Sequence, residues 1–403
     1  MTGHLASRFD TMGEQAYAVI AGPRARQSEV GSLLAQARPL AEAAAVSVRG
    51  RGGLAAFVGW VPRRHLGELR SALDAHFHGR YWLDAHEPSG DELAEVPSLV
   101  RYPGWLKPFV PLVESYGISR YGEFDPALPF AITYLVLFGA MFGDVGHGAV
   151  ILLLSAGLIR RFGRIAWVGV AAGGVSMGFG LLYGSIFGYE NLIEPLWLSP
   201  LHDPVRVLTV AIAFGVGFIT FTLLANAWNR AVAGRASDAL FDSGGLAGLV
   251  FYLGAVAGLA SLAGAADLAG PAWIVAGFGL AVVAAYKWFE ARAGLAERIL
   301  VTLIETLETA INLFSNTLSF MRVAAFSLNH VALALAVFTL AAGLSDAGHW
   351  LTLVLGNIVI IVLEGAIVAI QALRLMYYEG FSRFFSGDGK AFVPLRLTPQ
   401  ANP

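Results

Sequence analysis

The stretch from Ser315 to His330, SNTLSFMRVAAFSLNH, places an arginine inside a long apolar segment. The apolar run from Ala296 past Leu344 contains no proline, which favours one long helix. An ionised side chain near the middle of a bilayer costs about 2.5–3.5 kcal/mol on insertion scales, and a guanidinium does not lose its proton at any working pH. We therefore interpret Arg322 as a functional residue.

A row of polar residues follows one face of this predicted helix. Its members recur every seven residues, close to two helical turns, so they lie along one slowly drifting face. They are Glu308, Ser315, Arg322 and Asn329. The pattern predicts a single polar stripe on an otherwise apolar helix.

A second apolar segment, IVLEGAIVAIQALRLMYYEGFSRF from Ile361, carries a similar stripe. Glu364, Gln371 and Arg374 lie seven and three residues apart and therefore share a helix face. Two polar-striped helices in one apolar domain are expected to face each other or a common partner. A lone polar residue in a span is about as often a buried tether between helices as a functional residue, and that alternative stays open. Two aligned stripes with two arginines nevertheless favour a functional role.

The composition is that of a polytopic membrane protein. Of the 403 residues, 56% are hydrophobic and 14% are charged, and the mean hydropathy is +0.62, which is too apolar for a soluble domain of this size. The absence of cysteine excludes disulfides and thiolate metal sites. Neither a nucleotide-binding loop nor a nucleophile–base constellation is found, so we expect no cofactor and no ATP hydrolysis by the chain alone. The sequence lacks the cluster of basic and aromatic residues that is typical of a nucleic-acid-binding face.

About eight transmembrane helices are expected, of which the last two are long and tilted. The predicted spans are 127–142, 146–161, 165–184, 205–228, 245–264, 272–289, 297–344 and 348–381. The seventh span would extend about 72 Å at 1.5 Å per residue, against a hydrocarbon core of about 30 Å, so it must tilt, break or protrude. Basic residues gather at helix ends on one predicted side, whereas the opposite loops hold only Arg206, which predicts that both termini are cytoplasmic.

The chain divides by composition into three regions. Residues 1–104 predict a small cytoplasmic α/β domain with a linker, residues 105–126 a membrane-entry segment, and residues 127–396 the transmembrane domain. In the first region AYAVIAG (16–22), LAAFVGWV (54–61) and YWLDA (81–85) are typical of strands, and 26–45 and 62–77 of amphipathic helices. The first fifteen residues lack the apolar core of a secretory signal.

Two loops carry further candidate residues. GAMFGDVGHG (139–148) predicts a tight glycine hairpin whose Asp144 and His147 resemble either a metal pair or a proton relay. Two ligands three residues apart without a third are weak evidence for a metal, so no metal is expected and a structural role is favoured. Glu190 and Glu194, after the third span, are interpreted as solvated loop charges rather than ion ligands.

Three motifs resemble the membrane half of subunit a, also called subunit I, of the V/A-type rotary ATPases. They are SNTLSFMRVAAFSLNHVAL (315–333), LEGAIVAIQALRLMYYEGFSRFF (363–385) and LFGAMFGDVGHGAV (137–150), and the resemblance covers roughly residues 105–396. It implies a membrane stator with two offset aqueous half-channels, which converts proton flow into rotation. By position, Arg322 matches the essential arginine that faces the proteolipid ring in that family.

The resemblance also implies roles for other residues. The glutamate, glutamine and second arginine of the family's last helix match Glu364, Gln371 and Arg374. Glu308 and His330 are expected in or beside the half-channels, and a half-channel or structural role is expected for Asp144, His147, Ser315 and Asn329.

The partners implied by the resemblance are the proteolipid ring, the peripheral and central stalk subunits and the lipid of a prokaryotic inner membrane. The family carries a longer N-terminal arm, so FVGWVPRRHLGELRSAL (57–73) is expected to match only its membrane-proximal part.

Two other functions stay open at this stage. A secondary transporter could bind an anionic substrate with Arg322 and Arg374, but it would be expected to contain an internal repeat with paired broken helices, and no convincing repeat is found. A non-conducting assembly or anchor homologue would not need Arg322, Glu364 and Arg374. The sequence does not distinguish proton from sodium, because the ion-binding carboxylate belongs to the ring.

Overall fold

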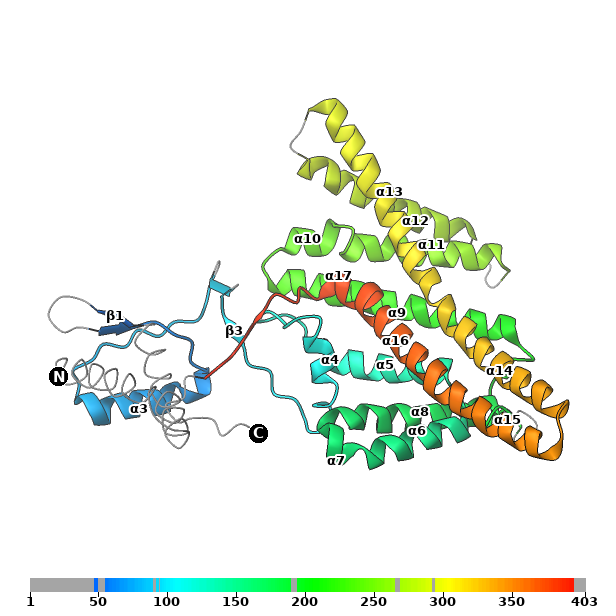
Figure 1. Cartoon of the computed structure of the whole chain (residues 1–403). Coiled ribbons are helices and arrows are strands. Elements are labelled where there is room, and N and C mark those ends of the chain that lie inside the picture. Colours follow the sequence, from blue (N-terminus) through cyan, green and yellow to red (C-terminus); the bar gives the residue numbers. More distant parts are fainter. Residues whose placement is uncertain are drawn as a thin grey trace, which may run out of the picture. The chain divides into compact units, whose positions relative to one another are not determined.

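The computed structural model describes residues 47–49, 55–89, 92–93, 95–189, 194–264, 269–291 and 294–394 (Figure 1). The chain forms two compact units, Met1–Leu99 with Ala391–Pro403 and Val100–Lys390. The second unit contains both polar stripes and the Asp144–His147 pair. It therefore holds all the residues for which the sequence predicts a functional role.

The described part of the first unit consists of a short hairpin and one well-formed helix. Its elements are β1 (Ser47–Arg49), β2 (Ala55–Phe57), the 3₁₀ turn η1 (Arg63–His65), α3 (Leu66–Phe77) and β3 (Pro97–Ser98). β1 and β2 pair antiparallel. α3 ends where His78 adopts a left-handed conformation with φ of 49°.

The sequence predictions for the first unit are partly confirmed. The helix expected over 62–77 is present as η1 and α3, and the strand expected over 54–61 is present only as β2. The prediction of a strand over 81–85 is wrong. No strand forms there, and the Tyr81 hydroxyl instead donates a hydrogen bond of 2.7 Å to Asp74 on α3. The strand expected over 16–22 and the helix expected over 26–45 lie outside the described residues.

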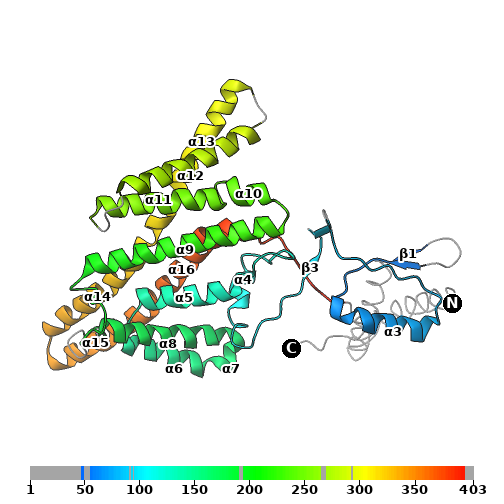
Figure 2. The same ribbon diagram turned by 180° about the vertical axis from the view of Figure 1, so that it is seen from behind.

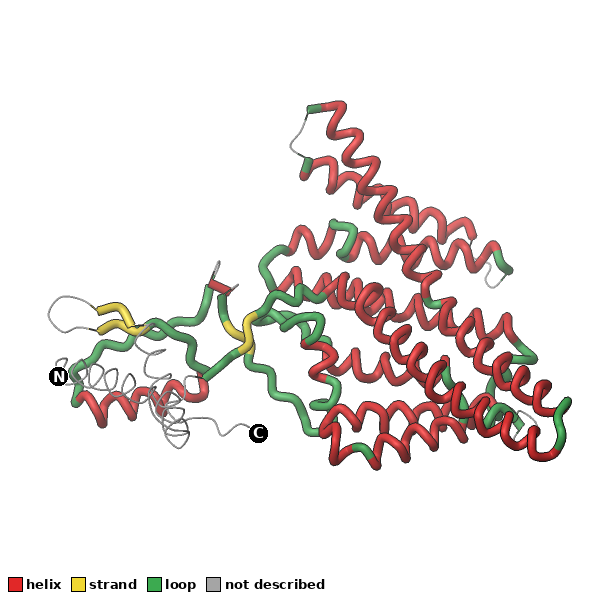
Figure 3. Tube along the Cα trace, viewed as in Figure 1, coloured by secondary structure: helices red, strands yellow, loops and turns green. Residues whose placement is uncertain are grey.

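The second unit is almost wholly helical (Figure 3). Its elements in chain order are α4 (Val110–Glu114), α5 (Ala127–Met141), α6 (Val145–Gly157), α7 (Ile159–Phe162), η3 (Gly163–Ile165), α8 (Ala166–Tyr183), α9 (Pro204–Val232), α10 (Ala236–Phe241), α11 (Leu246–Leu262), α12 (Ala269–Glu290), α13 (Leu295–Ser319), α14 (Met321–Ala342), α15 (Asp346–Val359), η4 (Ile360–Glu364), α16 (Gly365–Leu375), η5 (Met376–Phe381), α17 (Ser382–Phe384) and β4 (Lys390–Ala391), which ends past the unit boundary.

The chain is a polytopic helical membrane protein. Among the described residues, six helices are long and apolar enough to cross a bilayer, and their mean hydropathies range from 1.5 to 2.6. α5 and α6, which correspond to the first two predicted spans, are apolar but only 15 and 13 residues long. The last two long helices, α13–α14 and α15–α17, cross the other helices obliquely in both views (Figures 1 and 2), as expected for the two tilted C-terminal helices.

The long seventh span is two helices joined at Phe320. α13 ends at Ser319 and α14 begins at Met321, so the regular helix is interrupted near its middle at one residue, which keeps right-handed helical backbone angles. The Phe320 side chain is fully buried beside Gly215 of α9, where an added Cβ would lie 2.7 Å from its ring. A residue without a Cβ on α9 therefore makes room for the aromatic ring at the break.

The last helix contains two π-helical turns, η4 and η5. π-helical turns are uncommon and occur frequently at functional sites. Glu364 is the last residue of η4, and Glu379 lies within η5. The segment between the two turns, α16, is regular, so the spacing of Glu364, Gln371 and Arg374 seen in the sequence is kept there.

The membrane-entry segment is bound to the end of the last helix. Arg120 donates from Nε and Nη2 to the two carboxylate oxygens of Asp388, and these hydrogen bonds lower the pKa of Asp388 below its ordinary value. Glu123 accepts hydrogen bonds of 2.8 and 2.9 Å from the backbone N and the hydroxyl of Ser386. Two segments that are far apart in the sequence are thus held together within the second unit.

Helices α6 and α8 pack through glycines. An added Cβ on Gly173 would lie 2.7 Å from the carbonyl oxygen of Gly148 and 2.7 Å from the backbone N of Leu152. Two backbones come this close only where no side chain separates them. The close helix approach predicted from the glycines of GAMFGDVGHG is therefore confirmed at Gly148.

We predict that Gly173→Ala destabilises the folded chain by about 1–3 kcal/mol, because the new methyl group overpacks a backbone contact. The matched control is Gly178→Ala on the same helix, where an added Cβ meets nothing within 4 Å. Thermal unfolding midpoints of the purified protein in lipid nanodiscs measure the difference. Equal midpoints for the two variants would contradict the prediction.

Candidate functional site

Arg322 lies in the first turn of α14, two residues after the break at Phe320. Its side chain is half-buried, and its Nη1 atom is buried without a hydrogen-bond partner among the described residues. The charged groups that act on it are Glu379, which attracts it, and Arg374, which repels it. The guanidinium therefore carries a donor group that is free to bind a further acceptor.

Glu379 is a residue that the sequence reasoning missed. It is 6% exposed, and its charge interacts with Arg322 and Arg374. It also interacts with Arg383, one helical turn further along. No acidic residue lies within one turn of Arg322 on its own helix, and it is the last helix that brings Glu379 near it.

Two polar neighbours of Arg322 in the sequence, Ser319 and Asn329, form hydrogen bonds with other groups. The Ser319 hydroxyl donates to the Ser315 carbonyl at 3.2 Å, and Ser315 itself is exposed. The side-chain amide of Asn329 donates to Glu364 at 3.5 Å. Spacing along one helix placed these polar side chains on one face but did not determine which of them reach the arginine.

Glu364 and His330 form a buried pair that joins the two polar stripes. Each side chain is 2% exposed, and His330 Nδ1 lies 2.8 Å from Glu364 Oε2. With Asn329 on the other carboxylate oxygen, one residue of the first stripe and its chain neighbour His330 bind one residue of the second stripe. The stripes thus face each other here, as interpreted from the sequence.

The other two members of the second stripe are less buried. Gln371 is half-buried, and its Oε1 atom has no hydrogen-bond partner among the described residues. Arg374 is exposed on the surface of α16. Arg374 therefore presents a positive charge to a partner that lies against this face, whereas the Gln371 acceptor atom is buried.

Asp144 caps the N-terminus of α6 and is fully buried. One carboxylate oxygen accepts from the backbone N of His147 at 2.8 Å and of Phe187 at 2.9 Å. The other accepts from the Ser185 hydroxyl at 2.6 Å and the backbone N of Gly188 at 2.8 Å. These four donors give the carboxylate a structural role, because they fix the loop after α8 to the start of α6.

His147 connects Asp144 to the Glu364 pair. It is fully buried, its Nδ1 lies 3.4 Å from an Asp144 oxygen, and its ring is perpendicular to that of His330 at 5.3 Å. Its Nε2 lies 2.6 Å from the side-chain oxygen of Asn357 on α15. The sequence reasoning missed Asn357, although it lies seven residues before Glu364 and extends the second stripe by one step.

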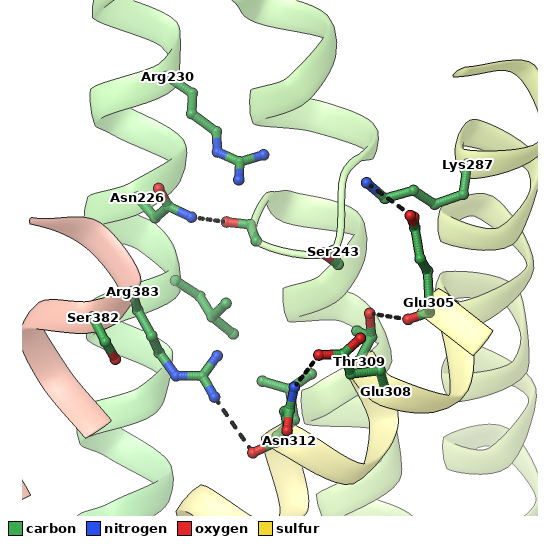
Figure 4. A pocket seen from close by; sticks show the side chains of 13 residues that line it. Asn226, Arg230, Ser243, Lys287, Glu305, Glu308, Thr309, Asn312, Ser382 and Arg383 are labelled. Atoms are coloured by element: carbon green, nitrogen blue, oxygen red, sulfur yellow. Dashed lines mark hydrogen bonds and ion pairs between the residues drawn. The ribbon is translucent and has the colours of Figure 1, made fainter. Parts of the chain in front are cut away.

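A polar cavity of about 400 Å³ lies between α9, α12, α13 and α17 (Figure 4). Its polar lining residues are Asn226, Arg230, Ser243, Lys287, Glu305, Glu308, Thr309, Asn312, Ser382 and Arg383. Glu308 is exposed and accepts a hydrogen bond of 3.4 Å from Asn312. Arg383 donates to the Asn312 carbonyl at 3.4 Å, so the cavity extends to the residue one turn beyond Glu379.

Ion pairs hold the wall of this cavity together. Lys287 lies 3.0 Å from Asp242 and 3.5 Å from Glu305, and Arg230 also pairs with Asp242. These residues join α9, α12 and α13 through the turn after α10. In the sequence, Arg230 and Lys287 are recognisable only as two of the basic residues at helix ends, because their common partner Asp242 lies in another segment.

The buried ionisable groups occupy two regions along the last helix. Glu364, with His330, lies in one region, and Glu379 and Arg383, with the cavity, lie in the other. Arg383 lies nineteen positions after Glu364, which is about 28 Å of helix at 1.5 Å per residue and close to the thickness of a hydrocarbon core. Arg374 lies between these regions in the chain, and Arg322 faces it from α14.

Glu194 is exposed, in agreement with its interpretation as a loop charge, whereas Glu190 lies outside the described residues. The three-residue group of Asp144, His147 and His330 has the composition of a metal site. The sequence reasoning weighed only the first two of these residues.

Residues 45–167 and 286–397 match the V-type ATPase 116 kDa subunit family. The chain is 31% identical over 407 residues to the A-type ATP synthase subunit I of Aeropyrum pernix, with 87% of this chain and 59% of that protein covered. It is 29% identical over 372 residues to the A-type ATP synthase subunit I of Thermococcus kodakarensis, with 85% and 54% covered. The chain thus spans between half and three fifths of the length of these relatives.

We predict that Asp144→Asn destabilises the fold by roughly 2–3 kcal/mol, because an amide NH₂ would face donors that now bind a carboxylate oxygen. Asp203→Asn is the control, since that side chain is 45% exposed and pairs only with Arg206 at 3.4 Å among the described residues. Thermal unfolding in nanodiscs measures both variants. An Asp144→Asn protein as stable as the control would remove the structural role of this carboxylate.

Proposed function

The chain belongs to the V-type ATPase 116 kDa subunit family, and on that basis we propose that it is the membrane stator subunit of a rotary proton-transporting ATPase or ATP synthase. It acts as one subunit of the complex and has no catalytic activity of its own. The similarity to subunit I proteins over most of the chain does not favour a secondary transporter.

The observation that carries this proposal is the half-buried Arg322, with an unpartnered donor group in the middle of an apolar helix pair. A fixed positive charge favours the ionised form of any carboxylate that passes it. A carboxylate on the proteolipid ring would therefore release its proton before it reaches Arg322 and regain one afterwards. Within the subunit, Glu379 offsets the charge while no ring carboxylate is adjacent.

Two proton paths on opposite sides of Arg322 follow from the polar groups described above. Glu364, His330 and His147 form a buried row of groups that hold and release protons, which suits one half-channel. The polar cavity that contains Glu308 and ends at Arg383 suits the other. Because Arg322 lies between the two regions, its positive charge blocks direct passage of protons, and protons move from one region to the other on the carboxylates of the proteolipid ring.

The basic residues at the helix ends support one orientation of the subunit. Arg230 and Lys287 belong to the side that is rich in arginine and lysine, so the cavity faces the cytoplasm and both termini are cytoplasmic. The loop after α8 then faces the opposite side. The partners are the proteolipid ring, the central and peripheral stalk subunits and the lipid of a prokaryotic inner membrane.

We predict that Arg322→Ala abolishes ATP-driven proton pumping while the subunit still assembles with its ring. Arg322→Lys should be strongly impaired, because lysine has a shorter reach and no planar donor fork. The measurement is acidification of vesicles by the reconstituted complex, with assembly checked by gel filtration. Arg206→Ala, at a 72% exposed arginine, is the matched control. Normal acidification by an assembled Arg322→Ala complex would overturn the proposed function.

Glu364→Gln is expected to slow pumping at least about tenfold while assembly survives, because glutamine keeps the shape of the side chain but cannot exchange a proton. Glu194→Gln changes an exposed loop carboxylate and serves as the control. Initial acidification rates at saturating ATP measure both. A wild-type rate for Glu364→Gln would assign this residue to structure alone.

A further inference from the structure

Three buried side chains that can each bind a metal ion meet where α6 faces α14. One carboxylate oxygen of Asp144 and one ring nitrogen each of His147 and His330 lie within 4.8 Å of one another. Asp144 and His147 are 0% exposed and His330 is 2% exposed. The sequence argument against a metal depended on the lack of a third ligand, and the fold supplies one from α14.

Both histidines are held through one ring nitrogen while the other is left without a hydrogen bond. His330 uses Nδ1 to bind Glu364 at 2.8 Å, and its Nε2 is buried with no hydrogen-bond partner among the described residues. His147 uses Nε2 to contact Asn357 at 2.6 Å, and its Nδ1 is likewise buried without a hydrogen bond. Metal-binding histidines have this arrangement, because an outer acceptor fixes the ring and the free nitrogen binds the ion.

The spacing of the ligand atoms fits a small ion after a limited contraction. Bonds of about 2.0–2.2 Å to a tetrahedral ion place its ligand atoms about 3.3–3.6 Å apart. His147 Nδ1 and Asp144 Oδ1 are already 3.4 Å apart. The most distant ligand atoms, at 4.8 Å or less, would have to approach by up to about 1.4 Å, which small rotations of the side chains can supply.

We propose that Asp144, His147 and His330 form a binding site for Zn²⁺. Two imidazole nitrogens and a carboxylate oxygen, with a fourth position left for water, are a ligand set that this ion accepts. The four hydrogen bonds to Asp144 make its carboxylate the weakest ligand, so the histidines supply most of the affinity. Metal binding does not depend on the proposed function, but its effect on proton transport does, because the ion would occupy nitrogens of the proposed proton path.

The test uses the full-length chain, purified through a tag without histidine and placed in lipid nanodiscs. Zn²⁺ affinity is measured by competition with a fluorescent zinc indicator, and the visible absorption of bound Co²⁺ reports a four-coordinate site. His147→Ala and His330→Ala should each weaken the tightest site at least about tenfold, and Asn357→Leu, which removes an outer acceptor, about tenfold. His349→Ala is the matched control, since that ring binds the Ala341 carbonyl at 2.9 Å outside the group.

Zinc that binds at other places on the protein is distinguished from the proposed site by comparing the wild type with the variants. Other histidines are present in every sample, so only the affinity lost in the variants of the group counts. Asn357→Leu retains all three ligands, so it still tests the site if the histidine variants misfold. A rise in unfolding temperature with Zn²⁺ should occur in the wild type and not in His330→Ala. Equal Zn²⁺ affinity in the wild type, His147→Ala and His330→Ala would overturn the site.

A second measurement separates this inference from the proposed function. Zn²⁺ should inhibit acidification by the wild-type complex over the concentration range in which it binds the purified chain. Binding without inhibition would support the metal site and contradict the position of His147 and His330 on the proton path. Inhibition with unchanged binding in the histidine variants would overturn the metal site and leave the proton path standing.

Discussion

A charged group inside an apolar helix bundle needs a partner within the protein, because the surrounding hydrocarbon supplies none. The second unit meets this requirement for some of its charges by pairing groups from different segments, such as His330 with Glu364 and Lys287 with Asp242. Breaking a buried pair by removing one member typically costs about 3–5 kcal/mol. The positions of the charges therefore help to determine which helices pack together, in addition to any role they have in transport.

The candidate residues that could be predicted are those whose signal lies within one segment. Arg322 and Glu364 are conspicuous because each interrupts an apolar run, and their spacing from other polar residues indicates a common face. Glu379 could not be assigned to Arg322 in this way, because the two lie on different helices. Asn357 could have been found, since it continues the seven-residue spacing of its own helix.

The same distinction explains the errors and gaps in the fold. Hydrophobic length predicted the spans, but the interruption at Phe320 lies against Gly215 of another helix, a contact that no local pattern reports. The segment YWLDA (81–85) has the alternation of a strand, yet a hydrogen bond from Tyr81 to Asp74 holds it against α3. Local periodicity thus describes what a segment can form, and contacts between segments decide what it does form.

The π-helical turn η4 has a consequence for how this chain can change during evolution. A π turn holds about one residue more than an α-helical turn, and each residue turns a helix by about 100°. Because the wider turn takes up its extra residue over nearly the same rotation, loss of one residue from Ile360–Glu364 would restore a regular helix and leave Gln371 and Arg374 on nearly the same face relative to Asn357. Loss of one residue from a regular α-helical part of the same helix would instead swing all the following residues by about a quarter of a turn. Deletions are therefore expected to be tolerated in this turn more readily than elsewhere in the helix.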